Sequence, residues 1–362
     1  MSKILTMTKY IQYILFLLVV SINNTNAQSK KTVLPSDETI FDNDQSIESW
    51  LKENKIPTLG LGIIENGKLK YVRVFGEIKK GISAPNNTYF NVASLTKPVT
   101  AMVALRLISL GKWKLDEPLD QYWIDPDLVN DPRHKKLTTR IILTHQTGFP
   151  NWRWMNNDKK LNFQFDPGTK YQYSGEGFEY LRKALEKKFG KPLEQLAQEL
   201  IFQPLTMNDT NYIWDQNTNE SRFAIGYNKA GQPYPTEKRE TANAADDLHT
   251  TIGDYGNFLI SIMKGKSLKP EVFQEMVKKQ VKIKDDLYFG LGFGMYDLGN
   301  NNYALSHSGS DPGTRCIAFI LPNSGKGILV FTNVDDGQKI YDKLITHYLG
   351  EDGKKIIEIE NR

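Results

Sequence analysis

Cysteine, histidine and net charge are all scarce in this chain of 362 residues. Its one cysteine, Cys316, has no partner for a disulfide within the chain, and we expect it to pack as a small apolar residue in a strand. The formal charge at pH 7 is only +4, and charges of both signs are mixed along the chain without a basic tail. This pattern gives no indication of nucleic-acid binding or of attachment to an anionic membrane.

Several common catalytic and binding motifs are also absent. The chain has no Gly-x-Ser-x-Gly nucleophile motif. It has no complete phosphate-binding loop, because Ile260 stands where the loop ending in Lys266-Ser267 needs its first glycine. The five histidines, at positions 134, 145, 249, 307 and 347, are scattered and lack His-Glu-x-x-His spacing. We therefore expect no zinc site.

The first 27 residues are typical of a secretory signal peptide. Two lysines precede an apolar run from Tyr13 to Val20, and polar residues separate this run from Ala27. The run is too short to span a bilayer, so we expect cleavage near Ala27, no stable membrane insertion, and export to the periplasm or the medium. The alternative is an uncleaved anchor. Cleavage would lower the formal charge from +4 to +2, and residues 28–362 would form the mature domain.

Strand patterns lie at both ends of this domain, and helical patterns lie between them. Asn66-Gly67 joins two β-runs, 58–65 and 68–75, and is the strongest short-range signal for a hairpin. Further β-runs lie at 303–307, 314–321 and 326–332. Helical patterns lie at 44–54, 94–111, 138–145, 177–189, 193–200, 251–263 and 338–349. One sheet must therefore take strands from both chain ends. We expect an α/β protein of the α+β type, with an antiparallel sheet from about 44–93 and 286–349 and a helical part from about 94–285.

Ser94 and Lys97 form a Ser-x-x-Lys tetrad at the predicted start of a long helix. Three residues apart on a helix, the hydroxyl and the amine point into one pocket, which places a nucleophile beside its activator. The helix N-terminus adds free N–H groups where an oxyanion would form. The tetrad occurs four times, at Ser49/Lys52, Ser94/Lys97, Ser109/Lys112 and Ser261/Lys264. Only Ser94 combines a helix start with a preceding buried strand; the alternative is an N-cap serine beside a solvated lysine.

Tyr173 follows a glycine-rich turn that leads into the helix at 177–189. An unperturbed tyrosine has a pKa near ~10, so the phenol needs an unusual setting to act as a base. An ammonium held close, that of Lys97, would favour the phenolate, which would then take the proton of Ser94. The alternative is a packing tyrosine with a hydrogen-bonded hydroxyl. Nearby, Trp152 and Trp154 lie in a loop that either walls a pocket or is pinned to the core by its tryptophans.

A third patch, His307-Ser308-Gly309-Ser310, lies at the end of a predicted strand. A strand edge flanked by glycine lets a substrate approach the backbone, and the N–H of Ser310 would be the second oxyanion donor. His307 would contact the substrate or assist proton transfer, with a structural histidine as the alternative.

In this order and spacing, the three patches resemble the serine hydrolase family of class C β-lactamases, low-molecular-weight penicillin-binding proteins, D-aminopeptidases and related esterases. The stretches 142–148, 165–168 and 289–293 are also similar to that family. The resemblance implies an antiparallel sheet flanked by terminal helices, with an inserted helical part and the site between them. It implies Ser94 as the acylated nucleophile, Lys97 as the residue that tunes the proton relay, Tyr173 as general base and acid, and His307 and Gly309 as the strand-borne motif, with no metal or cofactor.

Two departures from the family pattern bear on the substrate. Gly175 stands where the lactamases and peptidases usually carry an asparagine that holds the substrate amide, and His307 stands where they usually carry a lysine that binds the substrate carboxylate. An unperturbed histidine is mostly neutral at pH 7. Arg315 would replace that cation from the following strand, or it forms a surface ion pair.

These residues predict an exported serine hydrolase that forms an acyl-enzyme on Ser94. An esterase or a peptidase acting on D-amino-acid or D-Ala substrates fits the two departures best. A class C-like β-lactamase and a penicillin-binding sensor that is acylated without turnover are the alternatives. The expected partner is a small-molecule or peptide substrate (an ester, a D-amino-acid peptide or a β-lactam).

Overall fold

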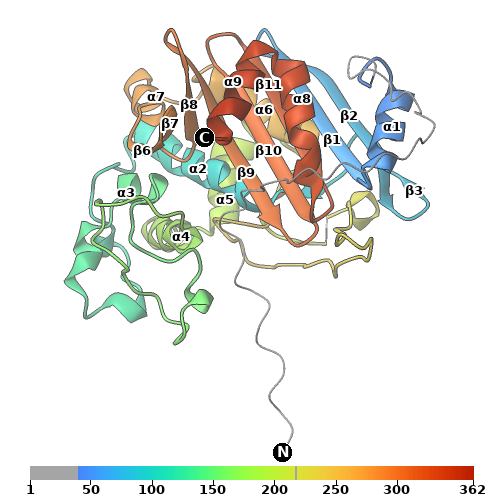
Figure 1. The fold of residues 1–362 in the computed structure, drawn as a ribbon. Helices are drawn as coiled ribbons and strands as arrows, with labels where there is room; N and C mark the ends of the chain where they lie inside the picture. The colour runs from blue at the N-terminus through green and yellow to red at the C-terminus, as the bar shows by residue number, and fades with distance from the viewer. Residues whose placement is uncertain (1–39, 217) are drawn as a thin grey trace, which may run out of the picture.

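The computed structural model describes residues 40–216 and 218–362 (Figure 1). The predicted signal peptide, residues 1–27, lies outside the described residues. Within the described ranges, no helix is both long and apolar enough to cross a bilayer.

One large antiparallel sheet joins the two ends of the chain. Its order in the described residues is β3-β2-β1-β11-β10-β9-β8-β7-β6. The strands are β1 Thr58–Glu65, β2 Lys68–Lys79, β3 Ile82–Ser83, β6 Val281–Lys284, β7 Leu287–Phe289, β8 Gly294–Gly299, β9 Asn302–Asp311, β10 Thr314–Leu321 and β11 Lys326–Thr332. Strand β1 pairs with β11 from Leu59↔Thr332 to Ile64↔Gly327. The prediction of one antiparallel sheet built from both chain ends is therefore confirmed.

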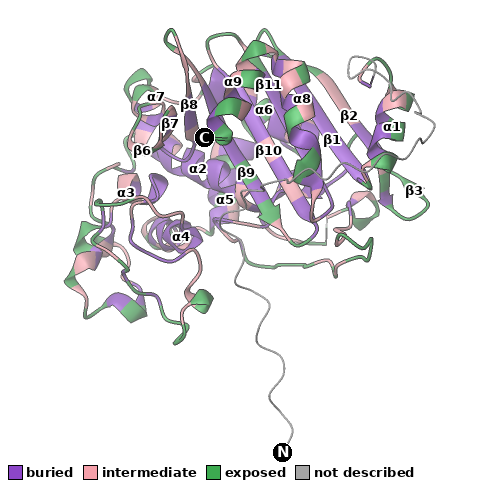
Figure 2. Ribbon diagram, in the orientation of Figure 1, coloured by how far each residue is buried: buried purple, intermediate pink, exposed green. Residues whose placement is uncertain are grey.

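Helices cover both faces of the sheet, so strands β1 and β11 at its centre are buried except at Glu65 and Lys326 (Figures 1 and 2). The outer face carries α1 Asp44–Glu53, α8 Tyr341–Leu349 and α9 Glu351–Glu360. The inner face packs on α6 Ile252–Met263 and α2 Thr96–Ser109. Leucines and glycines alternate along β1, and a Cβ at Gly60 would lie 2.8 Å from the Ile252 side chain. Glycine on the inner face therefore lets α6 lie close to the strand.

The helical part contains short helices linked by long irregular segments. Besides α2 and α6 it holds α3 Thr139–Leu143, α4 Gly175–Phe189, α5 Leu193–Ala197 and α7 Pro270–Met276, with 3-10 segments at Ala93–Leu95 (η2), Leu119–Gln121, Pro126–Leu128, Pro132–Lys136, Arg153–Met155 and Glu220–Arg222 and a π segment at Gln198–Phe202. A further 3-10 segment, Gly337–Ile340, precedes α8. A small second sheet pairs β4 Phe90–Asn91 with β5 His249–Thr250, and this pairing brings the segment before β5 next to Ser94.

The structure differs from the sequence-based expectation at several element boundaries. Strands β6, β7 and β8 have no counterpart in the prediction, and the returning sheet begins at Val281 rather than at about 286. These strands are only 4, 3 and 6 residues long, and each is too short for a clear alternating pattern. Helices α7 and α9 also have no counterpart in the prediction.

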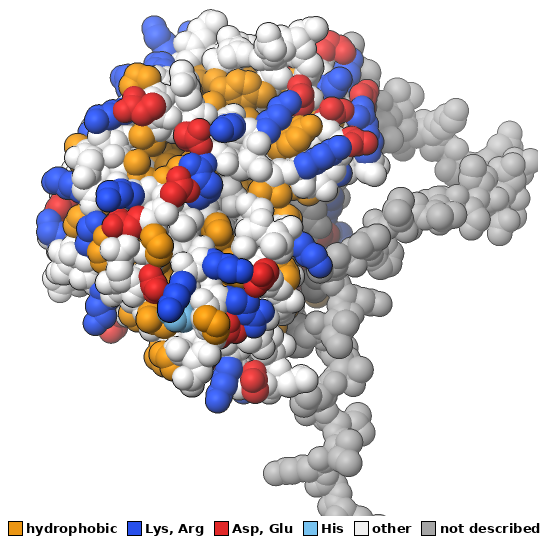
Figure 3. Space-filling model, turned by 90° about the vertical axis from the view of Figure 1, so that its left-hand side faces the viewer, with side chains coloured by type: hydrophobic (Ala, Val, Ile, Leu, Met, Phe, Trp, Pro, Cys, Tyr) orange, Lys and Arg blue, Asp and Glu red, His pale blue; other side chains and the backbone are white. Residues whose placement is uncertain are grey.

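The surface carries charges of both signs. On the face drawn in Figure 3, Lys and Arg lie beside Asp and Glu over the helical part, without a patch of one sign. Cys316 is fully buried in β10, as expected for a small apolar residue in a strand.

Candidate active site

Ser94 lies in η2, a short turn between β4 and α2. The preceding Ala93 adopts φ +47°, a left-handed conformation that non-glycine residues rarely take. The turn is held by Asn91 Oδ1, which accepts the Ala93 N–H at 2.7 Å, and by the Tyr255 hydroxyl, which donates to the Leu95 carbonyl at 2.8 Å. The nucleophile is thus placed by a strained turn, and α2 itself begins at Thr96 rather than at Ser94.

Lys97 lies in the first turn of α2 and is 1 % exposed. Its Nζ donates to Ser94 Oγ at 2.9 Å and to the Ala245 carbonyl at 2.8 Å. Burial lowers the pKa of Lys97 to about 8, although the carboxylates of Asp246, Asp311 and Glu179 oppose this shift. The amine that contacts the nucleophile is therefore neutral in a minor fraction near pH 7 and mostly neutral above pH 8. The predicted pairing of Ser94 with Lys97 is present.

Tyr173 completes the cluster. Its hydroxyl hydrogen-bonds to Ser94, and its ring centroid lies 4.6 Å from Lys97 Nζ. Burial raises the pKa of Tyr173, and this effect outweighs the hydrogen bond from Ser94. The hypothesis that Lys97 holds Tyr173 as a phenolate is therefore contradicted for the free protein, because desolvation of the phenolate dominates. The free protein carries a neutral phenol.

Strand β9 approaches the nucleophile directly. A Cβ at Gly309 would lie 2.2 Å from the Val92 carbonyl and 3.2 Å from the Ser94 nitrogen, so only glycine permits this contact. Strand β8 pairs with β9 only as far as Ser306 and leaves the 307–311 edge without a strand on that side. Backbone N–H groups of this edge, including that of Ser310, lie on the segment that faces η2.

His307 is a neutral imidazole in this site. Its Nδ1 donates to the Ser308 carbonyl at 2.8 Å, and its ring centroid lies 6.1 Å from that of Tyr173. Burial, together with the nearby Lys97 charge, lowers the pKa of His307 to about 3. Its buried Nε2 has no hydrogen-bond partner among the described residues. An uncharged side chain at this position offers a hydrogen-bond acceptor rather than a cation for a substrate carboxylate.

Gly175 and Arg315 are the two remaining candidates. A Cβ at Gly175 would lie 2.7 Å from the indole of Trp152, which fills the space that an asparagine side chain would need. Arg315 donates to the carbonyls of Asp311 and Thr314, both at 2.6 Å, and its Cβ lies beside Gly337 before α8. Its guanidinium is therefore bound to the β9–β10 turn, and no contact with Ser94 is present.

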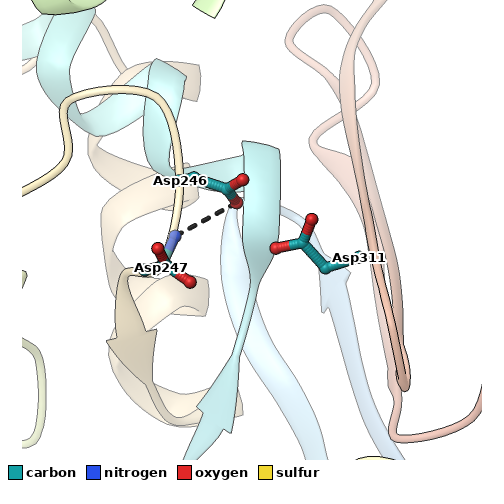
Figure 4. Close-up of side chains that lie close together, drawn as sticks. All are labelled: Asp246, Asp247 and Asp311. Atoms are coloured by element: carbon teal, nitrogen blue, oxygen red, sulfur yellow. Dashed lines mark hydrogen bonds between the residues drawn. The ribbon is translucent and has the colours of Figure 1, made fainter. Parts of the chain in front are cut away.

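Three carboxylates that sequence reasoning missed lie beside the site. Asp246, Asp247 and Asp311 place oxygens within 4.8 Å of one another (Figure 4). Burial raises the pKa of all three carboxyl groups. The charge of Asp246 adds to this effect at its two neighbours: it helps to raise the pKa of Asp247 to about 6, and it raises the pKa of Asp311 further. Asp247 is paired with Arg239 and accepts from Asn91. No sequence motif marks this acid trio, because strand β9 and the loop before β5 meet only in the fold.

The acid trio could offer oxygen ligands to a hard cation. Ca²⁺ takes six to eight oxygens and Mg²⁺ about six. Three carboxylates, one of them already neutralised by Arg239, supply only part of such a set. The arrangement fits a local negative field better than a resident metal.

A cavity of about 640 Å³ extends from the acid trio. Trp152, Trp154, Phe223 and Tyr234 contribute aromatic walls, and Glu237 adds a further carboxylate. The cavity lies next to the catalytic cluster. Asp246 in its lining follows Ala245, whose carbonyl binds Lys97, and Trp152 in its lining packs on Gly175, close to Tyr173. Trp154 is 65 % exposed, so this loop walls a cavity rather than being pinned to the core by both tryptophans.

Comparisons with known proteins show the family of this chain. A family model described as Beta-lactamase matches residues 43–349. A β-lactamase of Pseudomonas fluorescens is 26 % identical over 70 % of this chain and 73 % of its own length. Esterase EstB of Burkholderia gladioli is 27 % identical over 54 % of this chain, and the match spans 56 % of EstB.

Solved structures share the fold. The D-amino acid amidase of Ochrobactrum anthropi SV3 superposes with a TM-score of 0.70 over 88 % of this chain and 98 % of its own, at 22 % identity. An octameric penicillin-binding protein homologue of Pyrococcus abyssi gives a TM-score of 0.73 over 86 % of this chain and 78 % of its own, at 21 % identity. At such identities these structures inform on the fold alone. With the family match spanning most of the sequence, the chain belongs to the Beta-lactamase family of serine hydrolases.

Proposed function

We propose that this protein is an exported serine hydrolase that forms an acyl-enzyme on Ser94, with esterase or D-amino-acid peptidase activity. The observation that carries the proposal is the contact of Lys97 Nζ with Ser94 Oγ at 2.9 Å, beside the Tyr173 hydroxyl. A nucleophile in contact with a base of lowered pKa is the arrangement that covalent catalysis requires.

In the acylation step, Ser94 Oγ attacks the substrate carbonyl and passes its proton to the neutral amine of Lys97. Tyr173 gives its phenolic proton to the leaving group. Its phenolate then lies beside the new Lys97 ammonium, 4.6 Å from the ring centroid in the free protein, which stabilises it. In deacylation, water attacks the acyl-enzyme and gives a proton to the phenolate, while Lys97 returns a proton to Ser94. Both residues regain their starting state.

The backbone supplies the oxyanion donors. The N–H of Ser94 lies beside Gly309, and the 307–311 edge of β9 is open. We assign the two donors to the N–H groups of Ser94 and Ser310. Fixed donors of this kind typically contribute a factor of about 10²–10³ in kcat.

The charges near the site favour esters and amides without a free carboxylate. His307 is neutral, Arg315 is bound to backbone carbonyls, and the Asp246 carboxylate near Lys97 adds negative potential. A carboxylate of a β-lactam or of a D-Ala-D-Ala terminus would meet this field, and the guanidinium that lines the cavity, that of Arg239, is already paired with Glu237 and Asp247. The same field favours a D-amino-acid amide or ester with a free ammonium group, and cation–π contact with Trp152 and Trp154 would add to it.

Labelling and turnover test the proposal. A fluorophosphonate probe followed by peptide mapping should modify Ser94, and no label should appear in Ser94→Ala. The wild type should turn over p-nitrophenyl acetate and D-alanine p-nitroanilide faster than nitrocefin or a D-Ala-D-Ala peptide. Absence of label at Ser94 would refute the hydrolase. Rapid nitrocefin turnover would favour the β-lactamase alternative, and a stable penicillin adduct without release would favour the sensor.

A further inference from the structure

His145 is a fully buried histidine that contacts Tyr173 but takes no part in the proton transfers above. It follows α3 and adopts φ +55°, in the left-handed region. Its carbonyl accepts the Gln172 N–H at 2.8 Å, and its Nδ1 accepts the Ser174 N–H at 3.1 Å. One residue therefore binds the backbone on both sides of Tyr173.

The imidazole also packs on the tyrosine ring. The two ring centroids are 4.3 Å apart, with an angle of 34° between the planes. On its other sides, His145 contacts Phe289 at 4.9 Å and Phe178 at 5.4 Å between centroids. The ring is thus wedged between Tyr173 and these phenylalanines, and it leaves little freedom for the tyrosine ring to shift.

The hydrogen bonds determine the tautomer of His145. Because Nδ1 accepts from Ser174, the proton of the neutral ring resides on Nε2. Protonation at Nδ1 would abolish that bond. Burial and the charge of Lys97 also keep the pKa of His145 well below its usual value. The side chain is therefore a constant acceptor across the working pH range.

Tyr173 needs such an anchor because its own segment is irregular. Residues 171–174 belong to neither a helix nor a strand, and α4 begins only at Gly175. A phenol that must reach Ser94 and then a leaving group tolerates little displacement, since an error of 1 Å can reduce a rate by about 10²-fold.

Resting on the proposed function, we propose that His145 is a positioning residue that fixes the phenol of Tyr173 for proton transfer. It acts through two hydrogen bonds to the flanking backbone and one ring contact. Its role is distinct from that of His307, which lies on β9.

A double-mutant cycle tests this role. His145→Phe keeps an aromatic ring and removes the Nδ1 acceptor, and we measure kcat and KM for p-nitrophenyl acetate with Tyr173 present and in a Tyr173→Phe background. With Tyr173 present, kcat should fall about 10- to 100-fold with KM within about twofold. In the Tyr173→Phe background the same change should alter kcat less than about twofold. An equal loss in both backgrounds would overturn the proposal.

A second variant covers failure of His145→Phe to fold. Asparagine tolerates positive φ, and its side-chain oxygen can replace the Nδ1 acceptor, so His145→Asn should retain kcat to within about tenfold. His145→Ala lacks both acceptor and ring and should lose at least about ten times more than His145→Asn. Equal activity of the asparagine and alanine variants would refute the acceptor role.

Two further measurements distinguish positioning by His145 from a general loss of stability and from direct proton transfer. His134 is also buried but lies in the Pro132–Lys136 segment, so His134→Asn should leave kcat unchanged. The loss of kcat in His145→Phe should be the same from pH 6 to pH 9; a loss that varies with pH would make His145 a general base and overturn the proposal.

Labelling separates this proposal from the proposed function. If wild-type Ser94 is not labelled by fluorophosphonate, the proposed hydrolase fails first. If Ser94 is labelled at equal rates in wild type and His145→Phe, only the role of His145 fails.

Discussion

The pKa of Lys97 leads to a specific prediction for the pH dependence of acylation. If the neutral amine accepts the proton of Ser94, the rate follows the neutral fraction of Lys97. With a pKa of about 8, this fraction is about 1 % at pH 6, about 9 % at pH 7 and about 90 % at pH 9. The second-order rate constant for acylation should therefore rise about tenfold per pH unit below pH 8 and level off near pH 9.

Removing one carboxylate should move this transition in a known direction. Asp246 carries a negative charge that raises the pKa of Lys97, so Asp246→Asn lowers that pKa further. The rising limb should move to lower pH, and acylation at pH 6 should become faster than in wild type. Two further carboxylates, those of Asp311 and Glu179, also raise the pKa of Lys97. The charge of Lys97 in turn lowers the pKa of His145 and His307.

The assay is fluorophosphonate labelling of Ser94, followed by quenching and gel fluorescence between pH 5.5 and 9.5. Ser94→Ala gives the background, and circular dichroism at each pH controls for unfolding. A flat profile, or a limb above pH 10 where an unperturbed tyrosine or lysine titrates, would refute the assignment of Lys97 as the proton acceptor. So would a shift of the limb to higher pH in Asp246→Asn.

Three substitutions test the packing of the site. Gly309→Ala places a Cβ 2.2 Å from the Val92 carbonyl oxygen. Labelling of Ser94 should therefore fall at least about tenfold, and thermal melting should show a free energy of unfolding lower by about 1–3 kcal/mol. Wild-type values for both would contradict the close approach of β9. Gly175→Asn should displace the Trp152 indole, which lies 2.7 Å from the new Cβ. Tryptophan fluorescence should be quenched or shifted, and nitrocefin turnover should not increase. An increase of nitrocefin turnover above about tenfold would show that the missing amide alone limits lactam hydrolysis. Arg315→Ala should change kcat/KM for a D-Ala-D-Ala peptide less than about twofold, because its guanidinium binds the β9–β10 turn; a selective rise in KM for that peptide would restore Arg315 as the carboxylate site.

Much of the fold followed from local patterns. The hairpin at Asn66-Gly67, the strands near the C-terminus and the helix after Ser94 each arise from short-range periodicity or turn chemistry. Strands β6 to β8 escaped prediction because they are short, and their place is set by pairing with one another and with β9. Pairing between distant segments is a property of the folded chain.

The candidate site divides in the same way. Spacing along one helix brings Lys97 to Ser94, so this contact was predictable from sequence. The motif order further suggested Tyr173 and Gly309, both of which lie at the cluster. The direction of the Tyr173 pKa was not predictable, because it depends on desolvation by residues from several elements.

The sequence by itself determined which side chains can react: a serine and a lysine one helical turn apart, a tyrosine after a glycine-rich turn, and a strand ending in His-Ser-Gly. Only the tertiary structure decided their protonation states and their surroundings. Lys97 binds a carbonyl 148 residues away, and Asp311 on strand β9 reaches Asp246 in the loop before β5. Desolvation and charge proximity depend on such long-range contacts, whereas helical spacing depends on neighbours in the chain.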